Sequence, residues 1–270
     1  MGVSDRHYFA WLAEALTRFE RESGELHTIA GSGSADLMVL AGARQNPAIA
    51  FVREALGGDR ASVRWLDRFE QGPDVEHVDF NALDDMQDAV CDVLMMTRAS
   101  YMIMEPTSFL RHTRRMLRPG GLMIIDWLHG AADAARLDLP GHHEYGGRAH
   151  SFFTTYVDEE SIAEYAPEFD ALVRHVNRPP SWVDVERPGG RVPMAHRVRR
   201  LINRTPEGTL TRAAYVHTLK ETLQHTGKHL IEPEMLGSFF EVVFRDARYL
   251  YPATRKFHLH LLTVLRPVGA

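Results

Sequence analysis

Between Phe109 and Trp127 the chain reads FLRHTRRMLRPGGLMIIDW. The sequence from Pro106 to Leu117 is compatible with a helix. The residues Arg118-Pro119-Gly120-Gly121 end this helix, because proline and glycine favour a turn over further helix. The unbroken apolar run from Leu122 to Trp127 then predicts a strand that is buried on both faces. A helix, a tight turn and a buried strand in this order indicate a parallel α/β sheet.

The sequence before this stretch supplies the other expected strands. The nearly continuous apolar run from Cys91 to Thr97 predicts a strand in the centre of the sheet. Shorter strands are expected from Ala61 to Leu66, ending at Asp67, and from Asp74 to Phe80. Further upstream the pattern indicates a strand, a glycine turn and two helices, with expected ranges Leu26–Ala30, Gly31–Ser34, Ala35–Ala43 and Pro47–Leu56.

The two ends of the chain add a helix and a strand pair. From Ser4 to Arg21 apolar residues recur with helical periodicity, so we expect an amphipathic helix. This helix either folds over the ligand site as a cover or packs against a partner subunit. Near the C-terminus, Thr211 to His225 has a helical pattern. Two extended segments follow, Phe240–Tyr251 and Lys256–Leu265, which form a natural antiparallel pair.

The alternation of strands and helices predicts a doubly wound, mostly parallel α/β sheet with a C-terminal antiparallel strand pair. Residues Leu128 to Thr211 do not fit this alternation, and they are too many for a plain connection. We interpret them as a lid inserted after the fifth strand. The expected organisation is an N-terminal cover helix (1–24), a Rossmann-like domain (25–127 and 212–270) and a substrate-binding lid (128–211).

Composition narrows the classes of function. The 270 residues are 44% hydrophobic and 25% charged, which is typical of a globular protein. The net charge of −5 argues against a nucleic-acid partner, which would require a basic surface. No apolar run approaches the length of a membrane span, and the single cysteine, Cys91, excludes an internal disulfide. We therefore expect a cytoplasmic protein that acts on a small molecule; a homodimer is left open.

The stretch Phe109 to Trp127 resembles the helix, the Arg/Lys-Pro-Gly-Gly turn and the fifth strand of the class I S-adenosylmethionine-dependent methyltransferases. The resemblance covers roughly residues 25 to 130 and 210 to 266. It implies a Rossmann-like domain that binds S-adenosylmethionine, and methylation of a small molecule.

The resemblance also implies which residues bind the cofactor. The glycine turn would approach the methionine carboxylate, because glycines allow close contact and a helix N-terminus offers free N–H groups. An acid after the second strand would bind the ribose, and polar residues after the third and fourth strands would contact the adenine and the methionine. The corresponding residues are Gly31, Ser32 and Gly33, then Asp67, then Asp79 and Asn81, then Thr97 and Arg98.

Methyl transfer from a sulfonium is an in-line displacement, so the protein mainly aligns the reactants, and a catalytic base is optional. His129, which follows the fifth strand together with Asp126, is our first choice for a base, although a histidine there can also be an ordinary loop residue. Tyr145 belongs to a group of lid aromatics that can hold a cationic sulfonium, or can simply form the lid core. The cluster His142-His143-Glu144 matches no closed metal motif, so no metal is expected.

Three alternative functions stay open. The chain has no acidic residue just before Gly31, where the family usually places one. A different use of the same cofactor, such as aminocarboxypropyl transfer or cyclisation, is one alternative, and a non-catalytic binding protein of this fold is another. A nicotinamide dehydrogenase shares the architecture, but the Arg-Pro-Gly-Gly turn and the C-terminal strand pair favour the methyltransferase.

Overall fold

The computed structural model describes twelve segments of the chain, which are residues 3–41, 46–67, 72–97, 99–100, 103, 105–129, 144–145, 148–149, 154–156, 229–231, 233–250 and 258–269. The predictions for Arg98, for the helix at 211–225 and for most of the lid at 128–211 lie outside these residues.

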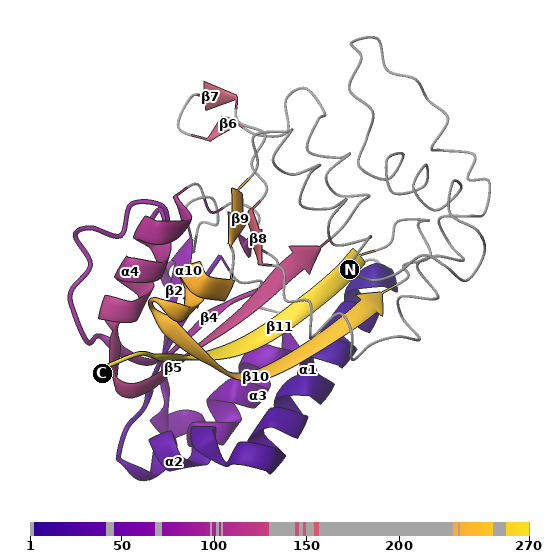
Figure 1. The fold of residues 1–270 in the computed structure, drawn as a ribbon. Helices are drawn as coiled ribbons and strands as arrows, with labels where there is room; N and C mark the ends of the chain where they lie inside the picture. Colours follow the sequence, from indigo (N-terminus) through magenta and orange to yellow (C-terminus); the bar gives the residue numbers. More distant parts are fainter. Residues whose placement is uncertain are drawn as a thin grey trace, which may run out of the picture.

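A seven-stranded sheet forms the centre of the described structure (Figure 1), in the order β10-β11-β5-β4-β1-β2-β3. The strands are β1 (Asp36–Leu40), β2 (Ser62–Asp67), β3 (Val75–His77), β4 (Cys91–Met96), β5 (Leu117–His129), β10 (Phe240–Leu250) and β11 (His258–Pro267). β11 runs antiparallel to both of its neighbours, and every other pair in this sheet is parallel. The predicted fold class, a mostly parallel sheet with an antiparallel C-terminal pair, is therefore confirmed.

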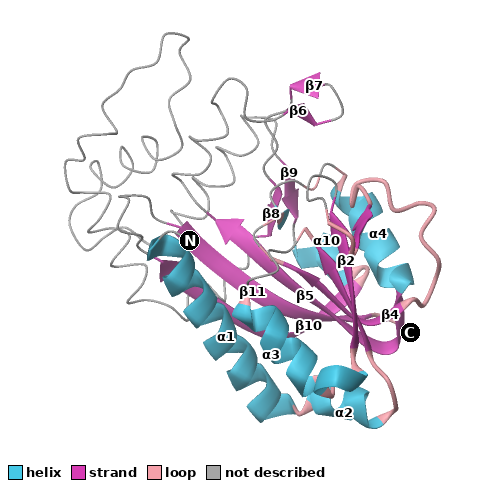
Figure 2. Ribbon diagram, turned by 180° about the vertical axis from the view of Figure 1, so that it is seen from behind, coloured by secondary structure: helices cyan, strands magenta, loops and turns pink. Residues whose placement is uncertain are grey.

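Helices cover both faces of the sheet. Figure 2 shows α1 (Val3–Ser23), α2 (Glu25–Gly31) and α3 (Pro47–Ala55) together on one face. The other face carries α4 (Pro106–Met116) and the short α10 (Pro233–Gly237). A single 3-10 turn, η1 (Gly58–Arg60), connects α3 to β2.

The central strands divide their side chains between two hydrophobic cores. Alternate residues of a strand point to opposite faces, so a strand that is buried on both sides has no polar face. On the face of α1 and α3 the buried residues include Leu37, Val39, Val93, Met95, Leu122 and Ile124. On the face of α4 they include Met38, Leu40, Leu94, Met96, Met123 and Ile125. This double burial is the reason that β1, β4 and β5 read as continuous apolar runs.

The predicted strand at Leu26–Ala30 is wrong, because these residues belong to the helix α2. The carboxylate of Glu20, which lies in α1, accepts hydrogen bonds from the backbone N–H of Leu26 (2.9 Å) and of His27 (3.2 Å). These two N–H groups lie in the first turn of α2, where a helix has no internal acceptors for them. Gly24, at φ 65°, makes the break between the two helices.

The predicted helix at Ala35–Ala43 is wrong for a related reason. Its residues Asp36–Leu40 form β1, which pairs with β2 on one side and with β4 on the other. A short apolar run fits a buried strand and a buried helix equally well, and only its neighbours decide between them. The run Gly31–Ser34 therefore precedes the first strand, and the loop that leaves this strand begins at Ala41.

The predicted turn Arg118–Gly121 lies inside β5, where it forms an irregularity in the pairing with β4, and it joins the amino ends of three strands. Arg118 donates to the carboxylates of Asp36, at the start of β1, and of Asp92 in β4, at 2.6 Å in each case. Gly120 has φ 80°, and a Cβ on Gly121 would lie 2.8 Å from the carbonyl oxygen of Asp92. The turn thus requires both glycines and the arginine for structural reasons.

The chain leaves the main sheet after β5 and returns to it at β10. In between, the structure describes β6 (Glu144–Tyr145) paired with β7 (Arg148–Ala149), and β8 (Thr154–Tyr156) paired in parallel with β9 (His229–Ile231). Ile231 is fully buried in the core on the α4 face. Two segments far apart in sequence, 154–156 and 229–231, are thereby held side by side.

We expect Gly121→Ala to lower the free energy of unfolding by about 1–3 kcal/mol, since the added methyl group would press on the backbone of Asp92. Gly31→Ala is the matched control, because a Cβ on Gly31 would meet no atom within 4 Å and its backbone is helical. Urea denaturation of both variants measures the difference. Equal stability of Gly121→Ala and the wild type would contradict the close-packed turn.

The free energy of unfolding should also depend on pH through the carboxyl group of Asp36. Burial raises the pKa of this carboxyl, but hydrogen bonds from Ser62 and Arg118 outweigh burial and hold the pKa below its ordinary value. The stabilisation is therefore complete above the unfolded pKa, about 3.9, and is lost as the pH falls through the folded pKa. Arg118→Met should be less stable than the wild type at neutral pH, and the difference should shrink in acid. Denaturation curves across this range would refute the pairing if the difference stayed constant.

Candidate functional site

The carboxyl ends of β1, β2, β4 and β5 lie at one edge of the sheet (Figure 1), which we call the carboxyl edge. In a doubly wound sheet the ligand binds beyond this edge, where the chain turns to opposite sides from two adjacent strands. Here β1 and β4 are these strands, because β2 and β3 continue on one side and β5 on the other. The site is thus expected between the loop after β1 and the loop after β4.

Asn46 connects these two loops. It caps α3, because its Oδ1 accepts from the backbone N–H of Ala48 at 3.0 Å. Its Nδ2 donates to Oγ1 of Thr97, directly after β4, at 3.2 Å, and both side chains are buried. The sequence analysis placed Thr97 correctly at the carboxyl edge but missed Asn46. The pair Asn46-Pro47 is a helix-start signal that could have identified it.

The predicted ribose and adenine residues also lie at the carboxyl edge. Asp67 is the last residue of β2 and is half-buried, in register with His77 of β3. Asp79 follows β3, and its Oδ1 accepts from the backbone N–H of Asn81 at 2.9 Å, which fixes this turn. The structure brings these residues to the edge at which a ligand is expected, and their contacts with a cofactor stay predictions.

The glycine turn does not lie with these residues, so its prediction needs correction. Gly31, Ser32 and Gly33 are exposed and precede β1, so the whole length of the strand separates them from the carboxyl edge. Ser32 donates to the carbonyl oxygen of Ile29 at 2.7 Å, which completes the end of α2. The glycine turn was expected to follow the first strand. The segment that follows β1 begins instead at Ala41, with φ 50°.

The predicted catalytic residue Asp126 is fully buried on the α1 face of β5. Its Oδ2 accepts from the hydroxyl of Tyr8 at 2.9 Å, and Nδ1 of His260 lies 3.1 Å from both carboxylate oxygens. The rings of Tyr8 and Trp11 pack against the imidazole, at centroid distances of 4.8 and 5.5 Å. Asp126 therefore holds α1 and β11 in place, and sequence alone did not reveal either partner.

The remaining predicted catalytic residues have described backbones only. His129 is the last residue of β5 and pairs with Leu259, and Tyr145 lies in β6. Their side chains, like those of His142 and His143, lie outside the described residues, as does Arg98. The roles of His129, Tyr145 and Arg98 stay predictions.

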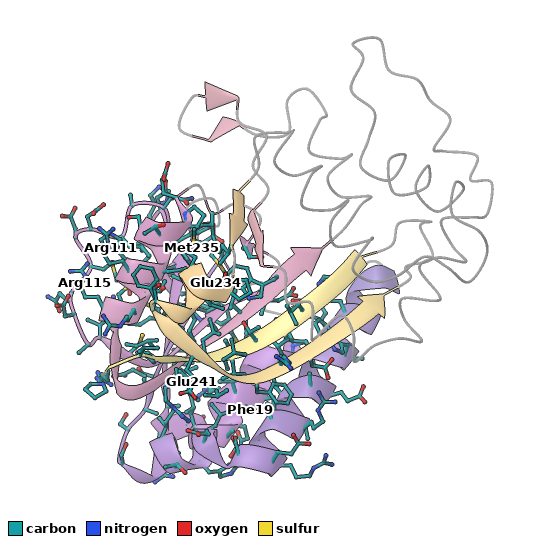
Figure 3. All side chains as sticks on the ribbon, viewed as in Figure 1. Phe19, Arg111, Arg115, Glu234, Met235 and Glu241 are labelled. Atoms are coloured by element: carbon teal, nitrogen blue, oxygen red, sulfur yellow. The ribbon has the colours of Figure 1, made fainter. Side chains whose placement is uncertain are left out.

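Helix α1 packs against its own chain. Figure 3 shows Phe19 on the side of α1 that meets the sheet, where its ring contacts Phe244 of β10 at a centroid distance of 5.4 Å. Leu12 and Leu16 are fully buried on the same side. The described apolar side chains of α1 therefore pack within the chain, and both roles expected for this helix, as a cover and in a dimer, stay predictions.

Neither a metal site nor a membrane span is found in the part of the chain that the structure describes. Within it, no group of three or more His, Cys, Asp or Glu side chains is arranged to hold a metal ion. No described helix has the length and hydropathy that a membrane crossing requires.

Asn46→Ala should lower the free energy of unfolding by about 1 kcal/mol, because α3 loses its cap. Asn46→Asp is the control, since a carboxylate still caps the helix but no longer donates to Thr97. Thermal unfolding compares the two. If Asn46→Asp were as damaging as Asn46→Ala, the cap would not be the main contribution.

Comparison with known proteins gives one family and several distant structures. Residues 46–125 match the family model of a methyltransferase domain. No curated protein sequence matches the chain.

A probable spermidine synthase from Corynebacterium glutamicum is 14% identical over 48% of this chain and 50% of its own, with a TM-score of 0.33, so the match spans about half of that protein. The N-methyltransferase NodS from Bradyrhizobium japonicum is 11% identical, covering 93% of this chain and 96% of its own, with a TM-score of 0.38. A putative sarcosine dimethylglycine methyltransferase from Galdieria sulphuraria is 14% identical, covering 96% and 85%, with a TM-score of 0.39.

Proposed function

We propose, from the premise that residues 46–125 form a methyltransferase domain of the class I S-adenosylmethionine-dependent kind, that this chain methylates a small molecule. The family match confirms the resemblance seen in the sequence, and with it S-adenosylmethionine as the cofactor. The small-molecule acceptor is our inference from the net charge of −5, which disfavours a polynucleotide substrate.

One observation carries the proposal. The matched segment begins at Asn46 and ends at Ile125, so it contains β2, β3 and β4 with their carboxyl ends, and β5 as far as Ile125. Asn46 and Thr97 meet across the point between β1 and β4 at which a doubly wound sheet binds its ligand. The family match and the geometry therefore point to the same edge.

The residues expected to bind the cofactor at this edge have the following proposed partners. Asp67 accepts hydrogen bonds from the ribose hydroxyls, and Asp79 and Asn81 lie near the adenine. The N-terminus of α3 would face the methionine carboxylate, since the positive end of a helix dipole favours an anion. Thr97 and Arg98 contact the methionine.

The reaction is a displacement at the methyl carbon. A lone pair of the acceptor forms the new bond to carbon while the carbon–sulfur bond breaks, and its electrons stay on sulfur as S-adenosylhomocysteine forms. The protein aligns the two reactants and excludes water. An acceptor that carries a proton releases it during or after transfer, and His129 is the proposed recipient. Tyr145 and the lid residues 128–211 would select the acceptor.

A second candidate is another use of the same cofactor. The end of β1 reads Val39-Leu40-Ala41, so the corrected loop also lacks an acidic residue before its glycine. This loop would face the aminocarboxypropyl arm, and its unusual sequence favours chemistry on that arm. Product analysis separates the two candidates, because methyl transfer releases S-adenosylhomocysteine and aminocarboxypropyl transfer releases methylthioadenosine.

Calorimetric titration with S-adenosylhomocysteine tests the cofactor site. We expect micromolar binding by the wild type and at least a tenfold loss in Asp67→Ala, which corresponds to about 1.4 kcal/mol of binding free energy. Ser32→Ala should bind as the wild type does, because Ser32 lies at the opposite edge of the sheet.

Either of two outcomes would oppose this assignment. Absence of binding by the wild type would remove the cofactor proposal and favour a non-catalytic protein of this fold. Wild-type affinity in Asp67→Ala, or a loss in Ser32→Ala, would place the cofactor elsewhere.

A further inference from the structure

Two buried carboxylates hold α1 to the sheet. Asp126 on β5 accepts from the hydroxyl of Tyr8 at 2.9 Å. Asp246 on β10 accepts from Nε1 of Trp11 at 2.8 Å and pairs with Arg18 at 2.6 Å. A carboxylate that leaves water is destabilised unless other groups replace its hydrogen bonds. The helix supplies those groups, so specific polar contacts attach α1 to the sheet in addition to its apolar packing.

The two attachments differ in position along the helix. Tyr8 lies in the N-terminal part of α1, whereas the Asp246 attachment extends from Trp11 to Arg18, near the other end of the helix. Figure 1 shows the N-terminal end of α1 next to the carboxyl ends of β5 and β10. If this end lifted, Asp126 would become hydrated, which compensates in part for the lost hydrogen bond. Opening of the Tyr8 end separates its ring from His260, but it leaves the packing of Leu16 and Phe19 in place.

The Asp126 contact lies next to the proposed cofactor site. Met96 pairs with Ile125, so the next residues along these two strands are Thr97 and Asp126. Both are buried, and both continue the set of alternate residues that faces α1. The hydroxyl of Ser100, in the segment after Thr97, also donates to the carbonyl oxygen of Asp126 at 2.7 Å. Asp126 thus connects α1 with the end of β4, where Asn46 meets Thr97.

The Asp246 contact is farther from that site. Asp246 pairs in register with Leu262 of β11, and Leu262 pairs with Asp126. Two strand spacings, about 10 Å, therefore separate the backbones of Asp246 and Asp126. Asp126 and Asp246 are both buried and both bind α1, but only Asp126 lies on the strand next to the carboxyl end of β4.

We propose that docking of Tyr8 on Asp126 is coupled to binding of the cofactor. In the docked state α1 closes the carboxyl edge beside β5 and fixes the segment after β4 through Ser100. When Tyr8 leaves Asp126, this segment loses a fixed neighbour and the site beside Thr97 loosens. Coupling of this kind is reciprocal, so the cofactor stabilises the docked helix by the factor by which docking strengthens cofactor binding. The inference rests on the proposed function.

Titration with S-adenosylhomocysteine of Tyr8→Phe, which removes only the hydroxyl, tests the coupling. We expect the affinity to fall about fivefold or more. Asp246→Asn is the matched control, because it weakens the other buried attachment of the same helix while leaving Asp126 unchanged. Its affinity should stay within about twofold of the wild type, close to measurement error in such comparisons.

Hydrogen exchange of the wild type gives a second readout that needs no variant. Saturating S-adenosylhomocysteine should slow exchange of the amides in the N-terminal turns of α1, and should leave the turns around Phe19 unchanged. Wild-type affinity in Tyr8→Phe, an equal loss in Asp246→Asn, or unchanged exchange in α1 would each overturn the coupling. If the wild type does not bind the probe at all, the proposed function fails as well, which distinguishes the two cases.

Discussion

The central strands β1, β4 and β5 bury both of their faces, and this constraint determines what the other elements must do. A sheet with no polar face requires a layer of helices on each side. On one side α4 and the short α10 provide it, and on the other side α1, α2 and α3 do. The N-terminal helix is therefore part of the core, and its residues Leu12 and Leu16 are as buried as the strands themselves.

Polar and charged side chains gather at both ends of the parallel strands. At the amino edge, Arg118 binds Asp36 and Asp92 and thereby joins three strands. At the carboxyl edge, the polar residues Asn46, Thr97 and Asp67 lie around the point where a ligand is expected. One edge satisfies its charges internally and is structural. The other presents a capped helix and strand ends of the kind that bind a nucleoside-containing cofactor.

Local sequence patterns predicted most elements to within a few residues, including β4, α4 and the C-terminal pair. They did so because continuous apolar runs and Pro-Gly turns depend on the chain close by. The errors arose where a distant group decides the outcome. Glu20 makes a helix of the segment Glu25–Gly31, and pairing with β2 and β4 makes a strand of Asp36–Leu40. The glycine turn at Gly31–Ser34 consequently precedes β1, whereas the sequence placed it after the first strand.

The candidate site likewise contains residues whose position local sequence predicts and residues whose environment depends on distant parts of the chain. The family resemblance assigned Asp67, Asp79, Asn81 and Thr97 from their places after predicted strands, and their positions at strand ends were predictable because the end of a strand is a local feature. The environment of Asp126 could not be inferred from its neighbours in sequence, since its partners Tyr8 and His260 lie more than a hundred residues away. A carboxylate after a strand looks the same in sequence whether it faces a substrate or a helix.

The position of β11 affects the order in which the molecule can be completed. This strand is the last of the described strands in sequence, yet it lies inside the sheet between β5 and β10 and carries fully buried residues such as Leu262 and Val264. During synthesis on the ribosome, the backbone groups of β5 that pair with β11 stay unpaired until β11 has emerged. Asp126 likewise lacks its contact with His260 until then. The nascent chain therefore keeps an open strand edge, a feature that favours aggregation, until β11 is made.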